Sequence, residues 1–248
     1  MVGKLLVRGM LAGIAAGLIT FGFARIAGEP QVDQAISFEE KADAAKGEAP
    51  EPELVSRETQ ASYGLFTGVM VYGASIGGLF ALVFAFAHGR AGRLSPRALS
   101  AWLALAAFVA VYLVPNIKYP ANPPSIGDPE TIGYRTGLFF LMIAISIAVS
   151  VFSLKMRAAF VPRLGAWNAS IAALVLFVVV IGAIQLALPT INEVPAAFPA
   201  VLLWKFRTVA IGMQAILWSV VGLLFGALVE RLERSGVRAG SLAARGAW

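Results

Sequence analysis

Long apolar runs separated by shorter polar segments form the main pattern along the chain. A helix needs roughly 20 apolar residues to cross the hydrocarbon core of a bilayer. Runs of this length, without alternation of apolar and polar positions, predict helices rather than the shorter strands of a barrel. We therefore predict an all-α integral membrane protein that forms a single membrane domain over residues 1–248, with six transmembrane helices near Leu5–Phe23, Tyr63–Ala87, Ala98–Val114, Gly133–Leu154, Ala166–Leu188 and Phe206–Leu228.

Residues 24–62 form the only long hydrophilic segment between these runs. Its acidic, proline-containing composition predicts a solvated and partly mobile outside loop. Within it we expect one short amphipathic helix at Phe38–Lys46 and an extended linker at Glu48–Glu53.

The segment Tyr112–Glu130, between the third and fourth runs, contains five prolines. Each proline lacks a backbone donor and restricts the residue before it. We therefore predict a shaped loop that is neither a helix nor a paired strand, lying at a membrane surface.

Composition supports a membrane protein, because 58% of the residues are hydrophobic and only 14% are charged. Soluble domains carry about 25% charged residues. Cysteine is absent and His88 is the single histidine. These counts exclude disulfides, thiolate metal sites and a multi-histidine site within one chain.

The distribution of charged residues predicts how the chain is oriented across the membrane. With both termini in the cytoplasm, that side carries 12 of the 20 Lys and Arg residues but only two of the 14 Asp and Glu residues, Glu230 and Glu233. Cytoplasmic loops of membrane proteins are enriched in Lys and Arg. The bias holds at every loop assigned to that side, so it favours six crossings.

Glycines recur at intervals of four on the first two predicted helices, where small residues let helix backbones approach closely. We favour packing within the chain over a glycine-lined pore or a dimer face for this set, which comprises Gly9, Gly13, Gly17, Gly64, Gly68, Gly73 and Gly77.

Short sequences recur near the helix ends. Pro115-Asn-Ile117 resembles Pro189-Thr-Ile191, and Tyr134-Arg135-Thr136 resembles Phe206-Arg207-Thr208. We take this as a hypothesis of repeated two-helix hairpins, a common arrangement in transporters. The spacing within the two copies differs.

Three arginines, Arg57, Arg135 and Arg207, each begin a helix predicted to run from outside to inside. A cation is disfavoured by the helix dipole at that end. We therefore expect salt bridges that join the outside loops, with partners among Asp128, Glu130, Glu193 and Glu53.

Oxygen-bearing residues on the same side are our candidates for metal ligands or for a metal entrance. Carboxylates suit hard cations and bind Co²⁺ more weakly. The candidates are Glu29, Asp33, Asp128, Glu130, Asn192 and Glu193. The alternative to a metal role for these six residues is that they belong to solvated loops with ordinary capping. His88 lies beside Arg90, and we expect it to be a surface residue rather than a ligand.

The predicted helices carry no Asp, Glu, Lys, Arg or His near their middles, unlike most proton-coupled pumps. No Walker-type glycine loop and no nucleophile–base pair is visible, so we expect neither an ATPase nor an enzyme. Inward movement of a dication would then depend on the membrane potential or on an energised partner.

Eight short segments together carry a resemblance to a known family: Arg25–Asp33, Glu53–Arg57, Val111–Pro115, Lys118–Pro124, Gly127–Gly133, Leu164–Asn168, Asn192–Pro195 and Leu203–Arg207. Over nearly its whole length the chain resembles the CbtA family, cobalt transporter subunits of the bacterial inner membrane. The resemblance implies a multi-pass protein of that membrane, often beside a small single-span partner that bears histidines. It implies no resident cofactor and no particular ligand residues.

The expected function is a membrane subunit of a cobalt uptake system, which passes Co²⁺ inward from the polar outside loops. A scaffold or assembly subunit that docks a partner through those loops without transporting is the alternative. Uptake of cobalt by the purified chain would separate the two.

Overall fold

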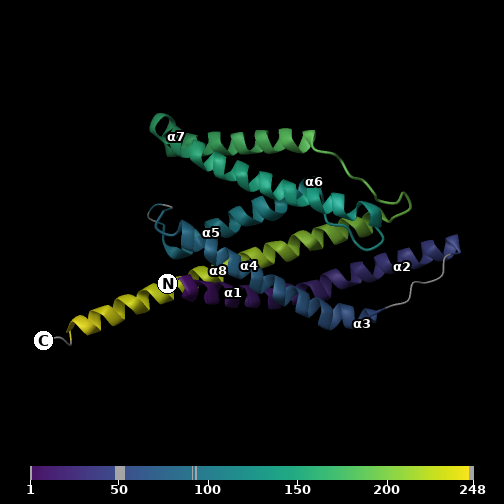
Figure 1. The fold of residues 1–248 in the computed structure, drawn as a ribbon, viewed down its shortest axis with the longest axis horizontal. Coiled ribbons are helices and arrows are strands. Elements are labelled where there is room, and N and C mark those ends of the chain that lie inside the picture. Colours follow the sequence, from purple (N-terminus) through teal and green to yellow (C-terminus); the bar gives the residue numbers. More distant parts are fainter. Residues whose placement is uncertain (1, 48–53, 91, 93, 246–248) are drawn as a thin grey trace. The chain divides into compact units, whose positions relative to one another are not determined.

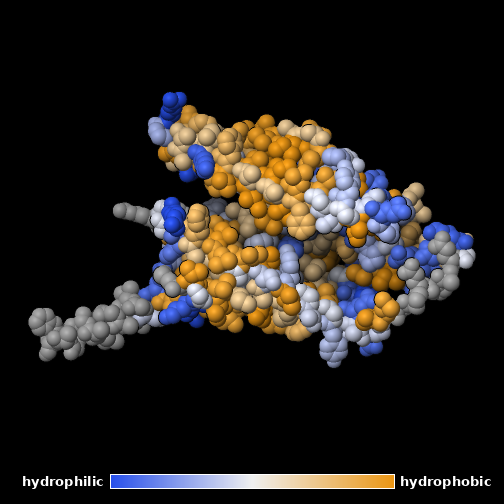
Figure 2. Space-filling view, viewed as in Figure 1, coloured by the Kyte–Doolittle hydropathy of each residue, from blue (hydrophilic) through white to orange (hydrophobic). Residues whose placement is uncertain are grey.

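The computed structural model describes residues 2–47, 54–90, 92 and 94–245, with side chains up to residue 235. These residues form helices and connecting segments and contain no strand, which agrees with the predicted all-α class. Five helical stretches among them are long and apolar enough to cross a membrane: Val2–Lys46, Arg57–Ala87, Pro96–Lys118, Pro129–Ala187 and Ala200–Ser235. Hydrophobic residues cover the middles of the helices, and hydrophilic residues gather at their ends (Figure 2).

The chain divides into two compact units (Figure 1). Unit 1 comprises Met1–Ala107 and Thr208–Trp248, and unit 2 comprises Phe108–Arg207.

The first helical stretch of unit 1 continues well beyond the predicted first span. Helix α1 (Val2–Phe23) passes through a π-helical segment, η1 (Ala24–Gly28), into α2 (Glu29–Lys46), which ends at Gly47 with φ 78°. The loop predicted over residues 24–62 is therefore wrong at residues 24–46, and again from Arg57, where further helical elements begin. The helix expected at Phe38–Lys46 is present and longer. The segment is rich in Glu, Gln, Lys and Ala. These residues favour a helix by their intrinsic propensity, even where no apolar stripe is present. The linker expected at Glu48–Glu53 lies outside the described residues.

Helices α1 and α4 (Leu65–Ala87) pack with their backbones in contact. A Cβ atom at Gly13 would overlap the carbonyl of Gly73, and one at Gly9 would overlap that of Gly77. A Cβ atom at Gly17 would overlap the end of the Met70 side chain rather than backbone. Packing within the chain is thus confirmed for these glycines. A Cβ atom at Gly68, in contrast, would meet no other atom within 4 Å, so Gly68 takes no part in this contact.

The two short elements before α4 are α3 (Arg57–Thr59) and the π-helical η2 (Gln60–Gly64). Ser56 begins them as an N-cap, since its hydroxyl accepts a hydrogen bond from the backbone N–H of Thr59 at 3.4 Å.

Helices α5 (Pro96–Ala107) and α8 (Ala200–Arg245) also contact each other within unit 1. The buried Ser100 hydroxyl donates to the carbonyl oxygen of Gly222 at 2.6 Å. Edge-on aromatic contacts fill the adjacent core, with ring centroids of Phe84 and Phe225 5.0 Å apart. Apolar packing and the buried hydrogen bond of Ser100 both stabilise this part of unit 1.

His88, which follows α4, is partly exposed and contacts Phe84 and Glu233. Its ring stacks on Phe84 at a centroid distance of 5.1 Å, and its Nε2 lies 3.3 Å from Glu233 Oε1. On α8, Glu230 pairs with both Arg97 and Arg234. The two acidic residues predicted on this side are thus both paired.

Unit 2 begins with the π-helical η3 (Phe108–Leu113) and continues into α6 (Val114–Lys118). The prediction of a non-helical loop from Tyr112 is therefore wrong as far as Lys118. A π-helical turn before Pro115 provides room where the proline ring would clash with the carbonyl four residues earlier. From Tyr119 onward the chain is irregular, apart from the 3₁₀ turn η4 (Pro129–Thr131).

Helix α7 (Ile132–Ala187) is broken at Gly165, which has φ 73° and ψ 163°. Unbroken, its 56 residues would measure about 84 Å, far more than a bilayer core. Instead its two arms lie side by side (Figure 1). Val114, Met142, Val149 and Ile181 form the core between the arms and α6.

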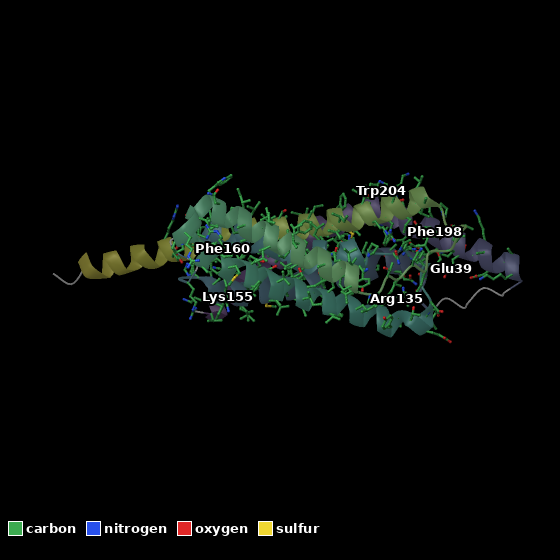
Figure 3. The ribbon with its side chains drawn as sticks, turned by 90° about the horizontal axis from the view of Figure 1, so that it is seen from above. Glu39, Arg135, Lys155, Phe160, Phe198 and Trp204 are labelled. Carbon is green, nitrogen blue, oxygen red and sulfur yellow. The ribbon has the colours of Figure 1, made fainter. Side chains whose placement is uncertain are left out.

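Polar contacts fasten both ends of this hairpin. Near the break, Arg157 Nε donates to Ser170 Oγ at 2.8 Å. Toward the other end, Gln185 Nε2 donates to the carbonyl oxygen of Val114 at 2.9 Å. Figure 3 shows Lys155 and Phe160 at the end with the break and Arg135 at the opposite end. The second end carries the pocket described next.

Candidate functional site

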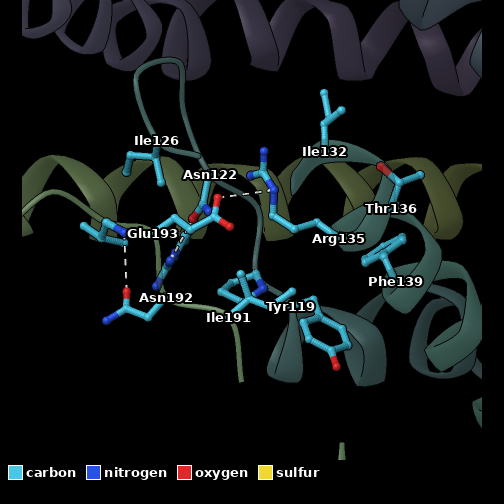
Figure 4. A pocket seen from close by; sticks show the side chains of 13 residues that line it. Tyr119, Asn122, Ile126, Ile132, Arg135, Thr136, Phe139, Ile191, Asn192 and Glu193 are labelled. Carbon is cyan, nitrogen blue, oxygen red and sulfur yellow. Dashed lines mark hydrogen bonds and ion pairs between the residues drawn. The ribbon is translucent and has the colours of Figure 1, made fainter. Parts of the chain in front are cut away.

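A pocket of about 430 Å³ lies within unit 2 at the end where the irregular segments meet (Figure 4). Three parts of the unit line it: the segment from Tyr119 to Ile126, the first turns of α7, and residues 191–194. Arg207, the last residue of the unit, completes the lining.

Two side chains of the proline-rich segment attach it to the segment after α7. Lys118 Nζ donates to Thr190 Oγ1 at 3.2 Å, and the Tyr119 hydroxyl donates to the carbonyl oxygen of Pro189 at 3.0 Å. Asn116, which is buried, accepts the backbone N–H of Ala121 at 3.2 Å. The pocket wall is therefore held by several hydrogen bonds although it has little regular structure.

Glu193 is the most highly connected acidic residue of the pocket. Its Oε1 accepts from the Thr131 hydroxyl at 2.7 Å, and its Oε2 accepts from the backbone N–H of Asp128 at 2.8 Å. Arg135 Nε lies 3.4 Å from the same Oε2. The bonds from Thr131 and Asp128, with the charge of Arg135, lower the pKa of Glu193 despite some desolvation.

Arg135 is fixed by the backbone as well as by Glu193. Its Nη2 donates to the carbonyl oxygen of Asp128 at 3.0 Å. The guanidinium also packs on Gly127, whose φ of 119° favours glycine and where a Cβ atom would overlap the guanidinium. Glycine is required here both for the turn and for the space.

Arg207 differs from the other two arginines singled out in the sequence. Its Nε donates to the carbonyl oxygen of Ala121 at 3.3 Å, and its Nη2 donates to Asn122 Oδ1 at 2.8 Å. In the part of the chain that the structure describes, it forms no ion pair with a carboxylate. The residue is half-buried.

The six predicted oxygen donors lie in two places. Asp128, Glu130, Asn192 and Glu193 belong to the pocket end of unit 2, where the structure brings Asp128 and Glu193 together. Glu29 and Asp33 lie in unit 1, where both pair with Arg57; Arg57 Nε is 2.9 Å from Asp33 Oδ1. The predicted partner Glu53 is outside the described residues.

Several oxygens of these residues already have partners within the protein. Asp128 Oδ1 accepts the backbone N–H of Glu130 at 2.9 Å, and Asn192 Oδ1 accepts that of Val194 at 3.4 Å. Among residues 2–47, 54–90, 92 and 94–245, no group of three or more His, Cys, Asp and Glu side chains is placed to hold a metal ion.

Sequence reasoning missed two residues of the site: Asn122, which lines the pocket, and Thr131, which donates to Glu193. Asp128-Pro129-Glu130 has the form of a helix start, with an acidic N-cap before proline, and this signal could have placed Thr131 in the first turn. No local signal links Asn122 to Arg207, since the two are 85 residues apart.

The lowered pKa of Glu193 predicts a pH-dependent contribution to stability. This contribution is fully present above the ordinary carboxyl pKa of about 4.3 and is lost as pH falls through the lower pKa of the folded state. We expect the thermal midpoint of the purified protein to fall on acidification less steeply in Glu193→Gln than in the unaltered protein. Glu130→Gln, which removes an exposed carboxylate nearby, is the control and should keep the original slope; equal slopes for Glu193→Gln and the unaltered protein would contradict the prediction.

Comparison with known proteins gives one match. The sequence model of a family described as "Probable cobalt transporter subunit (CbtA)" matches residues 2–230. No curated protein and no solved structure shows significant similarity to the chain.

Proposed function

The chain belongs to the CbtA family, and from this membership we propose that it is the membrane subunit of a cobalt uptake system in the bacterial inner membrane. The match over residues 2–230 carries the proposal, because it covers four of the five apolar helical stretches in full and the fifth, Ala200–Ser235, up to residue 230. The function is that of a transporter subunit rather than an enzyme.

We further propose six crossings with both termini in the cytoplasm. In this arrangement each arm of α7 crosses once, with the break at Gly165 on the cytoplasmic side. The basic residues Lys155, Arg157 and Arg163 next to the break support this orientation. The exposed Trp167 and Trp204, on the side of the break and of the pocket respectively, suit the two membrane–water interfaces.

The pocket end of unit 2 would then face the cation supply. We propose that the carboxylates of Asp128 and Glu130, which lie beside the pocket lining, attract Co²⁺ to the outer surface, as charges around an entrance rather than as a closed ligand cage. Asn192 adds a neutral oxygen there, and Glu193 contributes less because Arg135 pairs with it. Glu29 and Asp33 would contribute less, because Arg57 neutralises them. A negative potential inside the cell favours inward movement of a cation by about 2.3 kcal/mol per charge per 100 mV.

A small single-span partner with histidines would add imidazole groups, of which this chain has only one. Co²⁺ binds well to imidazole, and His88, the only histidine of the sequence, lies against Phe84 and Glu233. We propose that the partner supplies the imidazole ligands.

Uptake of radiolabelled cobalt into vesicles tests the proposal. We expect vesicles containing the chain and its partner to take up more cobalt than empty vesicles, and to take up more when the interior is made negative. Asp128→Asn and Glu130→Gln, which keep shape and remove charge, should together raise the cobalt concentration needed for half-maximal uptake. Glu40→Gln, an exposed acidic residue of α2, is the matched control.

The outcomes separate the alternatives. Uptake by the chain alone would show that it transports without a partner. Uptake equal to that of empty vesicles under all conditions would contradict transport and favour a scaffold that docks a partner.

A further inference from the structure

Arg207 differs from Arg57 and Arg135 because its charge has no acidic partner among the described residues. Arg57 meets Glu29 and Asp33, and Arg135 meets Glu193. Arg207 instead contacts neutral acceptors, the carbonyl oxygen of Ala121 and the side-chain oxygen of Asn122. Removing a cation from water without a counter-ion is unfavourable, so a half-buried guanidinium in a pocket favours binding of an anion.

The geometry leaves hydrogen-bond donors available on Arg207. Its Nε and Nη2 are engaged by Ala121 and Asn122, while Nη1 has no hydrogen-bond partner in the described part of the chain. A guanidinium matches a carboxylate well because its N–H groups form a planar fork. Asn122 holds the fork in place through its oxygen, which leaves its amide nitrogen as a further donor.

The charges around the pocket favour an anion over a bare dication. Arg135, Arg207 and Glu193 are the charged residues that line it. Glu193 is already held by Thr131, Asp128 and Arg135. The lining therefore carries one positive charge in excess, and that charge belongs to Arg207.

The rest of the lining is largely apolar, with Ile126, Ile132, Phe139, Ile191 and Val194 around the charged groups. A volume of about 430 Å³ is within the range of small-molecule sites. We propose that this pocket binds a small organic anion, with its carboxylate on Arg207 and Asn122 and its apolar body against these side chains. The inference does not depend on cobalt transport.

Binding of benzoate to the full-length protein in detergent, without cobalt, tests the inference. Benzamide has nearly the same shape but no charge, so it measures apolar binding and partition into detergent. We expect titration calorimetry to give at least about tenfold tighter binding of benzoate than of benzamide, as a charge-assisted contact predicts. Arg207→Gln should remove this preference, whereas Lys205→Gln, which removes an exposed charge outside the lining two residues away, should keep it.

A second variant places a counter-ion inside the pocket. Asn122→Asp puts a carboxylate at the position that Arg207 already contacts, so we expect benzoate affinity to fall at least about tenfold while the thermal midpoint stays or rises. This variant tests the inference even if Arg207→Gln fails to fold.

Three results would overturn the inference: equal affinity for benzoate and benzamide, unchanged benzoate binding in a folded Arg207→Gln, or full benzoate affinity in Asn122→Asp. Tighter binding of inorganic phosphate than of benzoate would also overturn it, because the apolar lining would then have no role. Since no cobalt is present, these results are independent of the uptake experiment.

Discussion

Replacing Gly13 by leucine is expected to prevent α1 and α4 from packing and to remove most of the folded protein. A Cβ atom at Gly13 would overlap the carbonyl oxygen of Gly73 and would lie 2.7 Å from its carbonyl carbon. Overpacking a core costs about 1–3 kcal/mol where side chains can move aside. Here the obstacle is backbone, so the helices must separate and we expect a loss of at least about 3 kcal/mol. That is a large part of the usual total stability of about 5–15 kcal/mol.

The measurement is the thermal midpoint and the yield of monodisperse protein in detergent. Gly68→Leu is the matched control, because Gly68 lies on α4 and has open space at the same atom. Helix propensity changes in the same direction in both variants, so the difference between them reports on the close contact. Equal midpoints for Gly13→Leu and Gly68→Leu would contradict the packing described for α1 and α4.

Arg57→Ala is expected to give the second large effect. Glu29 has a side chain only 9% exposed and would lose its ion-pair partner. Removing one member of a buried pair costs about 3–5 kcal/mol, because the other charge stays buried. Arg57 itself is 26% exposed, so solvent screens part of the interaction and we expect about 2–3 kcal/mol.

A second substitution separates the charge effect from the loss of packing. Adding Glu29→Gln to Arg57→Ala removes the uncompensated carboxylate and should restore more than half of the lost stability. Lys46→Ala, which breaks the exposed pair with Asp43, is the control and should change stability by less than about 0.5 kcal/mol. No recovery in the double variant would mean that Arg57 acts through packing alone.

The apolar stretches of the fold could be predicted because membrane-spanning helices are defined by length and hydropathy. The helical continuation through Glu29–Lys46 was predicted only over Phe38–Lys46, since its residues favour a helix individually but show no apolar periodicity that would extend it. Pro115 led to the wrong expectation for a different reason. A proline excludes an α-helical hydrogen bond, but a π-helical turn such as η3 accommodates it, and the sequence carries no clear signal for such a turn.

The candidate site was predictable in part. The predicted order of helices puts the segments after Pro115 and Pro189 at the same end, and the structure joins them through Lys118 and Tyr119. The pairing of individual charges was not predictable. Arg57, Arg135 and Arg207 occupy similar sequence positions, yet only three-dimensional proximity decides which of them meets a carboxylate.

The π-helical segment η1 changes the spacing between buried residues along the first helical stretch. Along α1 the buried positions include Gly9, Gly13, Gly17 and Thr20, and four residues later Ala24. The next buried residue is Glu29, five positions on, because a π turn holds one residue more than an α turn. In an uninterrupted α-helix, residue 28 would occupy that orientation and Glu29 would be rotated by about 100°. One extra residue in a single turn thus turns a carboxylate from the periphery of the helix toward Arg57.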